Sequence, residues 1–391
     1  MWLLIGNELL MTPGPTEVSE RVIRALVRPA MLHNEPRAFD MIDETCNSLK
    51  TIFRSEGDVV LLPGSGRTGM EAVITSVIEP GDKVLTVVSG VFSEWFKAII
   101  ERVGGIPIEA RFDFGKPIDV DTVKRKFQED DYKAVTLVHN ETSTGVTNPA
   151  EKIGEIVRDS DALFVLDTIS SLGGIPVDVN KWDVDLCLSA PQKCLGGFLG
   201  LSIISVSEQA WDKMERRKRV CTSYTLDLLR WKQIWFGAKV PRPYPVLVPP
   251  HLVVALNEAV KEVLEEGLEK RFERHRMAAK AMREGLKALG VRLFADESVA
   301  SNSITAFNIP VGLGDVDILN AMKQRYHVVG AGGMGSLRGK TIRFGHMANT
   351  ASENCVLRAL SALEMALIDL EQSVKCGVGV AAARQVYNSG F

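Results

Sequence analysis

The chain has 391 residues, of which 46% are hydrophobic and 24% charged, as in an ordinary globular protein large enough for more than one domain. Its formal net charge is -3, and its acidic and basic residues are interspersed. This balance excludes nucleic acid as an expected partner and favours a small-molecule substrate.

The cysteines and the apolar segments indicate a reduced, soluble protein. None of the 6 cysteines forms a C-x-x-C pair or has a histidine at zinc-site spacing, so we expect no metal site. No apolar run reaches the ~20 residues of a membrane-spanning helix, and the N-terminus lacks the basic stretch of a secretory signal. We therefore expect a cytoplasmic protein with no membrane partner.

Between residues 58 and 207, short apolar runs alternate with segments of helical periodicity. The apolar runs contain few polar residues, so the strands that they predict are buried on both faces. This pattern indicates a mostly parallel sheet covered by helices on both sides, an α/β/α sandwich. The expected strands cover residues 59–62, 84–88, 135–138, 163–166, 186–188 and 201–204.

A proline-rich crossing at 241–250 leads into one long helical pattern from about residue 251 to 288. The sequence beyond it predicts a smaller α+β domain. Its expected strands are 303–309 and 341–344, and its expected helices are 315–326 and 352–370. We expect four parts: an N-terminal arm at 1–11 that packs on a neighbour, a large domain at 12–264, a small domain at 265–372, and a loosely held tail at 373–391.

A glycine-rich loop, G-S-G-R-T-G at residues 64–69, follows the first strand and opens a helix. Glycines let the free amides at a helix N-terminus approach and hold a phosphate group. A dinucleotide-binding fold would also need an acidic residue at the end of the second strand, and that strand ends Val88-Ser89-Gly90. The loop favours a phosphate site, while a nicotinamide-dependent dehydrogenase and a purely structural turn stay open.

Three further strand ends carry polar residues. The H-N-E-T-S-T-G loop at 139–145 follows one apolar strand, Asp167 ends another, and Lys193 follows a third. A carboxylate such as Asp167 is costly to bury unless a positive or hydrogen-bonding group meets it. A desolvated lysine loses proton affinity, and its free amine can form a Schiff base with a carbonyl. Taken singly, each of these is also compatible with an ordinary loop residue.

These features lie at the edge where a parallel sheet binds its ligands. An anion cradle, a hydroxyl-rich loop, an acid and an isolated lysine are the four groups that pyridoxal phosphate uses in a protein. They hold its phosphate, its phenolic oxygen, its pyridinium nitrogen and its aldehyde. The sequence thus predicts a pyridoxal-phosphate enzyme.

In the order of these motifs, the chain resembles the class V aminotransferases, which have the fold type I of aspartate aminotransferase. Within that class it is most similar to the alanine-glyoxylate and serine-pyruvate aminotransferases. The resemblance runs from about residue 11 to 370 and implies a large sandwich domain with a smaller C-terminal α+β domain. The matching segments are residues 12–16, 64–66, 139–145, 167–174, 192–193, 241–244 and 342–345.

The resemblance assigns the cofactor contacts residue by residue. Lys193 would form the Schiff base with pyridoxal phosphate and would carry the proton to and from the substrate α-carbon. Asp167 would keep the ring nitrogen protonated, and Thr142 would reach the phenolic oxygen. Phe92 and Ile169 would lie against the two faces of the ring.

The phosphate and the substrate carboxylate are assigned in the same way. The phosphate contacts would come from Ser65, Gly66, Arg67 and Gln192. Arg343 would bind the α-carboxylate of the substrate as a bidentate fork. Because only one arginine is assigned to the substrate, monocarboxylic substrates are expected. A second carboxylate on Arg67, or on Arg242 of the partner subunit, would overturn that expectation.

Tyr244 corresponds to a tyrosine that in this family reaches the phosphate of the neighbouring subunit. The resemblance therefore implies a homodimer with shared active sites. Leu247 stands where a threonine often contacts the same phosphate, and Arg67 stands where the animal members have histidine. These two departures leave one inter-subunit contact and the role of Arg67 open.

The reaction that the resemblance implies moves an amino group from serine or alanine to pyruvate or glyoxylate by a ping-pong mechanism. Ureidoglycine as the donor stays open, because related glyoxylate aminotransferases share these motifs. A cysteine desulfurase of the same fold would need a histidine before the lysine and a nucleophilic cysteine on a mobile loop. This chain has Gln192 there and no such cysteine, and we expect Cys194 in the core.

Overall fold

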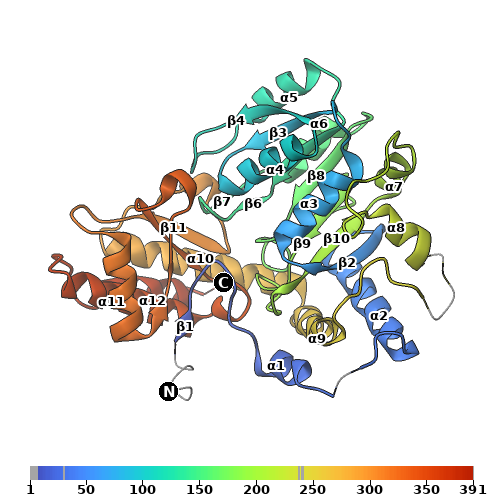
Figure 1. Ribbon diagram of the computed structural model, residues 1–391. Coiled ribbons are helices and arrows are strands. Elements are labelled where there is room, and N and C mark those ends of the chain that lie inside the picture. Colours follow the sequence, from blue (N-terminus) through green and yellow to red (C-terminus); the bar gives the residue numbers. More distant parts are fainter. Residues whose placement is uncertain (1–7, 30, 237, 239–241, 391) are drawn as a thin grey trace.

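A seven-stranded sheet forms the centre of the larger part of the molecule (Figure 1). The computed structural model describes residues 8–29, 31–236, 238 and 242–390, and within them the strand order is β2-β10-β9-β8-β5-β3-β4. In this order β10 runs antiparallel to both of its neighbours, and the other pairs are parallel. The strands are β2 (Asp58–Gly64), β10 (Gly200–Val206), β9 (Leu186–Ser189), β8 (Leu163–Asp167), β5 (Ala134–Val138), β3 (Lys83–Val88) and β4 (Ile106–Arg111).

The predicted strands and the mostly parallel sheet are confirmed. The seventh strand, β4, is not predicted by the sequence pattern, because it lies at the sheet edge and only Ala110 in it is buried. An edge strand needs no continuous apolar run, since one side of it faces solvent. The apolar runs therefore predict the interior strands and miss this edge.

Helical crossovers between the parallel strands cover both faces of the sheet. One face carries α3 (Gly66–Val77) and α4 (Val91–Arg102), which pack against each other. The opposite face carries α5 (Val120–Gln128) and α6 (Ala150–Val157), which also contact each other. The result is the α/β/α sandwich that the alternating pattern predicts.

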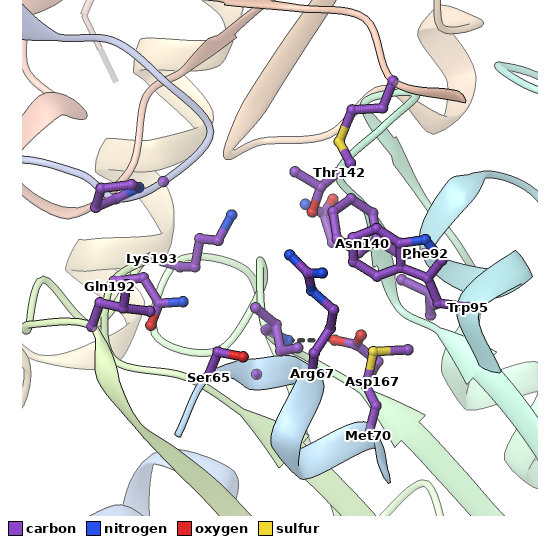
Figure 2. Close-up of a pocket in the computed structure, with 17 residues that line it drawn as sticks. Ser65, Arg67, Met70, Phe92, Trp95, Asn140, Thr142, Asp167, Gln192 and Lys193 are labelled. Carbon is purple, nitrogen blue, oxygen red and sulfur yellow. Dashed lines mark hydrogen bonds between the residues drawn. The ribbon is translucent and has the colours of Figure 1, made fainter. Parts of the chain in front are cut away.

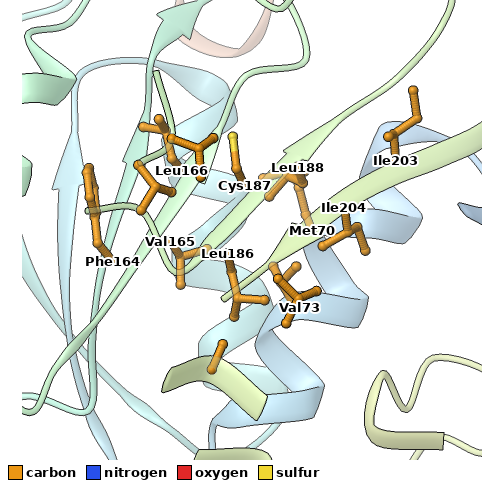
Figure 3. Packing of buried hydrophobic residues seen from close by; sticks show 14 of the residues in the cluster. Met70, Val73, Phe164, Val165, Leu166, Leu186, Cys187, Leu188, Ile203 and Ile204 are labelled. Atoms are coloured by element: carbon orange, nitrogen blue, oxygen red, sulfur yellow. The ribbon is translucent and has the colours of Figure 1, made fainter. Parts of the chain in front are cut away.

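The core of this sandwich fixes α3 against the sheet. Figure 3 shows Met70 and Val73 of α3 facing Leu186, Leu188 and Ile204 of the sheet, and all five side chains are buried. The spacing of Met70 and Val73 puts them on one side of the helix. This apolar layer also fixes the N-terminus of α3, and with it the glycine-rich loop, relative to the strand ends.

The C-terminal part of the chain forms a second, smaller unit, drawn in orange and red in Figure 1. Its antiparallel sheet contains β11 (Ile304–Asn308), β14 (Thr341–Gly345) and β13 (Ala331–Gly332). The helices α10 (Leu268–Ala288), α11 (Asp315–Tyr326) and α12 (Glu353–Asp369) share its core. The strands and helices expected here are confirmed, while the domain boundary at 264/265 stays a prediction.

The single long helix expected from about residue 251 to 288 is two helices. α9 (Pro250–Glu266) ends at Gly267, and α10 begins directly after it. Gly267 has a φ of 83°, which glycine adopts without the strain that other residues incur. The apolar periodicity continues through the break, so the helical pattern by itself does not reveal it.

The expectation of a loosely held tail is not met. Within that segment, α13 (Val378–Asn388) packs against α10 and α12, and Ala383 and Val386 are buried. The contact is made largely by small residues: a Cβ atom on Gly379 would lie 2.9 Å from the Leu289 side chain. Small residues give little hydrophobic signal, which explains why the sequence pattern misses this helix.

The N-terminal arm is described from residue 8, and residues 1–7 lie outside the described residues. β1 (Leu9–Leu10) pairs in parallel with β12 (Val328–Val329) of the same chain. Leu9 and Met11 are buried in the core of the small unit. The described end of the arm thus packs on its own chain.

Within the described ranges, none of the helices combines the length and apolarity needed to cross a membrane. All six cysteines lie in these ranges and are free. Cys194 is buried with Ile304 and Met347, as expected for a core residue.

If α13 is a packed part of the small unit, placing a charge on its buried face must destabilise the protein. We expect Ala383→Asp to lower the free energy of unfolding by about 2 kcal/mol or more, because an unpaired carboxylate is forced into an apolar contact. The same change at the exposed Ala381 should alter it by less than about 0.5 kcal/mol. Urea denaturation of both variants measures the difference. Equal midpoints would show that the helix is not docked.

Candidate active site

A cavity of about 310 Å³ lies at the carboxyl edge of the large sheet (Figure 2). The parallel strands β5, β8 and β9 end there, which brings their following loops together. Met334 of the small unit and Gly14 and Pro15 of the N-terminal segment complete the wall. Of the residues predicted from the sequence, the wall contains Ser65, Gly66, Arg67, Phe92, Thr142, Asp167, Ile169, Gln192 and Lys193.

Lys193 reaches this cavity from the turn after β9. Its ammonium group donates to the carbonyl of Pro13, and a Cβ atom on Gly14 would overlap the lysine side chain. Glycine is therefore required at position 14, where φ is also 100°. Loss of solvent around the amine, helped by the positive charge of Arg343, lowers the pKa of Lys193 to about 8.

Asp167 ends β8 and is buried in the same cavity wall. One of its oxygens, Oδ1, accepts a hydrogen bond from the Ile169 amide at 2.7 Å (Figure 2). Burial raises the pKa of Asp167 to about 7, although the Ile169 bond and the charge of Lys193 act in the opposite direction. A positive group arriving beside this carboxylate would favour its ionised form.

The N-terminus of α3 forms the anion cradle. Ser65 is its N-cap, and the first amides of a helix have no partner within the helix. A Cβ atom on Gly66 would come within 2.5 Å of the Ile169 side chain, so only glycine lets the helix start approach this loop. The side-chain oxygen of Gln192 is buried with no hydrogen-bond partner among the described residues. These features fit a phosphate-bearing ligand.

Aromatic side chains enter the cavity from α4. The Phe92 and Trp95 rings meet edge to face, with centroids 4.5 Å apart. Both line the cavity, and Ile169 lines it from the loop after β8. Sequence reasoning selects Phe92 but misses Trp95, although their spacing of one helical turn could have indicated both.

Arg343 does not lie on the cavity wall. It belongs to β14 and is buried, with its guanidinium donating to the carbonyls of Gly332 at 2.8 Å and Thr142 at 3.2 Å. Among the described residues no carboxylate lies within ion-pair distance of it, and burial lowers its pKa to about 10, although the charge of Glu141 acts in the opposite direction. It is a buried cation that contacts the backbone of Thr142, a residue of the cavity wall.

Tyr244 also lies away from the cavity. Its hydroxyl donates to the His33 carbonyl at 2.7 Å, and its ring packs against Phe39 and Trp235. Arg242 forms a bidentate ion pair with Asp43, with both N–O distances 2.8 Å. Neither residue reaches the cavity of its own chain.

Glu141 is a second residue near the cavity that sequence reasoning passes over, although it lies inside the H-N-E-T-S-T-G motif. Its buried carboxylate accepts from the amides of Phe92 and Ser93 and from the amide and hydroxyl of Ser143. Burial raises the pKa of Glu141. It joins the loop after β5 to the first turn of α4, where a negative charge is stabilised by the helix dipole. Glu141 therefore positions Phe92.

The sequence and the fold of the chain match a known protein family. Residues 16–352 match the family model described as aminotransferase class V. The chain belongs to the class V aminotransferases. An uncharacterised aminotransferase of Methanocaldococcus jannaschii is 41% identical to it over 97% of each chain. The solved structure of the Bacillus subtilis ureidoglycine-glyoxylate aminotransferase matches with a TM-score of 0.95 and 33% identity, over 99% of this chain and 100% of that one.

A second solved structure, the pyridoxamine-pyruvate aminotransferase of Mesorhizobium loti, matches with a TM-score of 0.93 and 30% identity over 98% of each chain. These findings confirm the fold type I architecture and the class V family. Class V aminotransferases of this fold use pyridoxal phosphate, so the cofactor of this enzyme is pyridoxal phosphate. The dehydrogenase alternative is thereby excluded. The cysteine desulfurases that match are 17% and 14% identical and share the fold alone.

The role of Glu141 gives a prediction about stability and the aromatic wall. Glu141→Ala leaves several buried donors of α4 and Ser143 without an acceptor, and we expect a loss of about 2 kcal/mol in unfolding free energy. Trp95 fluorescence should shift as α4 moves. Glu94→Ala, in the same helical turn, breaks only the surface ion pair with Arg111 and should cost less than about 1 kcal/mol. Equal effects of the two changes would contradict the anchoring role.

Proposed function

We propose that this class V aminotransferase moves an amino group from serine or alanine to pyruvate or glyoxylate by a ping-pong mechanism. The observation that carries the proposal is the juxtaposition of Lys193 and Asp167 in one small cavity, with shifted pKa values on both. Perturbed acid and base groups in one cleft are typical of catalytic sites. Lys193 is the proposed attachment point of the cofactor.

When bound, pyridoxal phosphate supplies an aldehyde that joins to amino groups and a ring that accepts electrons from the substrate α-carbon. Lys193 provides the amine for attachment and then a base for the α-proton. A pKa of about 8 leaves a useful fraction of this amine unprotonated near neutral pH. Its position beside Gly14 limits how far the side chain can swing.

Asp167 is proposed to hold the proton on the ring nitrogen. A buried carboxylate has little water to stabilise its charge, so it interacts strongly with a cation placed next to it. Ser65, the Gly66 and Arg67 amides and Gln192 are proposed to hold the phosphate, and Thr142 the phenolic oxygen. Phe92 and Ile169 would then confine the ring and exclude water.

Arg343 is proposed to bind the substrate α-carboxylate. Its N–H groups are bonded to two backbone carbonyls, and none of the described carboxylates pairs with it. Exchanging a neutral carbonyl for a carboxylate gives a stronger, charge-assisted bond. Thr142, whose carbonyl accepts one of these bonds, lines the cavity, so the guanidinium lies directly behind the wall.

The two solved relatives support the acceptor. One acts on glyoxylate and the other on pyruvate, by the names that their structures carry. Ureidoglycine as the donor remains the second candidate, favoured by the match to the Bacillus subtilis enzyme. One methylene or hydroxyl changes substrate binding by only about 1 to 3 kcal/mol, so these donors differ too little for the fold to choose among them.

A homodimer with shared sites belongs to the same proposal. Tyr244 packs away from its own cavity, and the nearby Leu247 is 51% exposed. Leu199 is also exposed while lining the cavity. An exposed apolar side chain at the mouth of a site is well placed for contact with a second subunit.

The free cysteines support a reducing compartment such as the cytoplasm.

The first test is the visible spectrum of the purified protein. With pyridoxal phosphate supplied, the native protein should turn yellow, and L-serine or L-alanine alone should convert the cofactor to pyridoxamine phosphate. Lys193→Ala should bind the cofactor but show no conversion, because the base is gone. The exposed Lys270→Ala serves as the control. A protein that stays colourless would refute the site assignment.

The pKa of Lys193 predicts how cofactor attachment depends on pH. Only the unprotonated amine attacks an aldehyde, so the rate should rise as pH passes about 8 and then level off, well below the ordinary lysine value of 10.5. Removing the nearby cation in Arg343→Gln should move the midpoint upward, because protonated Lys193 is then less disfavoured. The same change at the exposed Arg338, Arg338→Gln, should leave the pH midpoint unchanged. Stopped-flow absorbance measures both, and a midpoint unaffected by Arg343 would contradict this coupling.

A further inference from the structure

One buried arginine of α10 is bonded to both loops that carry the proposed catalytic pair. Arg271 lies in the first turn of this helix, and only 4% of it is exposed. Its Nε atom donates to the carbonyl of Gly173 at 2.8 Å, and a terminal nitrogen donates to the carbonyl of Cys194 at 2.7 Å. Gly173 lies in the loop that follows Asp167, and Cys194 comes directly after Lys193. A single guanidinium therefore joins the two loops.

The two loops also pack tightly against each other at this point. A Cβ atom on Gly174 would lie 2.7 Å from the Sγ atom of Cys194, and Gly173 has a φ of 84°. Glycine at both positions allows this close approach without backbone strain. The Lys193 carbonyl accepts from the amide of Gly196 at 3.0 Å, which closes the turn that carries the lysine. A force on the Cys194 backbone is thus transmitted to Lys193 through one residue of a short, closed turn.

A carboxylate holds the remaining edge of the guanidinium. The second terminal nitrogen of Arg271 lies 2.5 Å from Glu266, which also pairs with Arg274 at 2.5 Å. Arg274 extends elsewhere, to the carbonyls of Ala348 and Ala351. An ion pair removed from water adds little net stability, because desolvation costs about as much as the attraction returns. Stability is therefore a weak reason for burying Arg271, whereas the pair with Glu266 fixes the orientation of its planar group.

We propose that Arg271 is a positioning residue for Lys193, which fixes the turn that carries the lysine relative to the loop that carries Asp167. The inference rests on the proposed function, in which Lys193 attaches the cofactor and moves the α-proton. Arg271 does not line the cavity, so it acts through the backbone of Cys194. A displacement of about 1 Å at a reacting group can lower a rate about 100-fold, so two hydrogen bonds that hold this turn can determine kcat.

The test compares Arg271→Met with Arg274→Met in the enzyme loaded with pyridoxal phosphate. Each change removes an arginine that pairs with Glu266, but Arg271 is the one of the two that holds the lysine turn. In Arg271→Met we expect kcat with alanine to fall about 10-fold or more while KM changes less than about 3-fold, because the base is misplaced and the carboxylate site is intact.

The visible circular dichroism of the bound cofactor, divided by its absorbance, gives a second readout. This ratio should fall in Arg271→Met, because the dichroism depends on a fixed orientation of the ring. Arg274→Met should keep the ratio, and its kcat should stay within about 3-fold of the native value. Equal losses in the two variants would show a general structural role and would overturn the inference.

Arg271→Lys separates orientation from charge and carries the test if the methionine variant does not fold. Lysine keeps the positive charge but lacks the planar fork that reaches two carbonyls at once. We expect a kcat between those of the native enzyme and Arg271→Met. A native kcat in Arg271→Lys would mean that charge alone matters, and the positioning role would be wrong.

A measurement without the cofactor distinguishes this inference from the proposed function. In protein freed of pyridoxal phosphate, acetic anhydride labels the unprotonated Lys193 amine, and mass spectrometry follows the labelling against pH. In Arg271→Met the midpoint should move up from about 8 toward the ordinary lysine value of 10.5, because a loosened turn admits water around the amine. Asp167 and Arg343, the charged groups that act on this amine, are unchanged in the variant. An unchanged midpoint overturns the inference. If no amino acid converts the cofactor in the native enzyme, the proposed function fails, and the labelling still decides whether Arg271 positions Lys193.

Discussion

The site depends on the withdrawal of water from two charged groups at one edge of a parallel sheet. Asp167 and Lys193 occupy the ends of neighbouring elements, and burial shifts their pKa values in opposite directions, to about 7 and about 8. In an exposed aspartate and an exposed lysine the two pKa values would lie much further apart, at about 4 and about 10.4. The sheet thus produces both pKa shifts, because the ends of its strands place these two side chains where they are buried.

Close backbone contacts make this desolvation possible. Gly14 lets the N-terminal segment cover Lys193, Gly66 lets α3 touch Ile169, and Gly90 lets the Glu141 carboxylate approach the start of α4. A side chain at any of these points would force the elements apart and admit water. The Glu141 carboxylate accepts hydrogen bonds from amides of α4, which would otherwise need water as a partner. The aromatic wall is therefore held by a buried carboxylate as well as by apolar packing.

Much of the fold and of the cavity wall could be predicted from the sequence, because both depend on short stretches of consecutive residues. The apolar strands and the polar residues that follow them are local signals, and Lys193, Asp167 and Ser65 come together for that reason. Glu141 could be read as part of a motif but not as an anchor, since its partners Phe92 and Ser93 lie on another element. The sequence pattern misses α13 because its small residues give little hydrophobic signal. It misses the break at Gly267 because the helical periodicity continues on both sides of that residue. Tyr244 is a different case, for its predicted partner belongs to a second chain.

The charges of the cavity link binding to proton transfer. Lys193, Arg67 and Arg343 outnumber the two carboxylates beside them, Asp167 and Glu141, so the charges around the cavity favour the binding of anions. Each anion that binds weakens the repulsion that Arg343 exerts on Lys193, and so raises the proton affinity of the lysine amine. In the proposed function, a substrate carboxylate bound to Arg343 would therefore make Lys193 a stronger base at the step that removes the α-proton. An enzyme that used an uncharged group to orient its substrate would lack this coupling, because filling such a site would leave the lysine amine as weak a base as before.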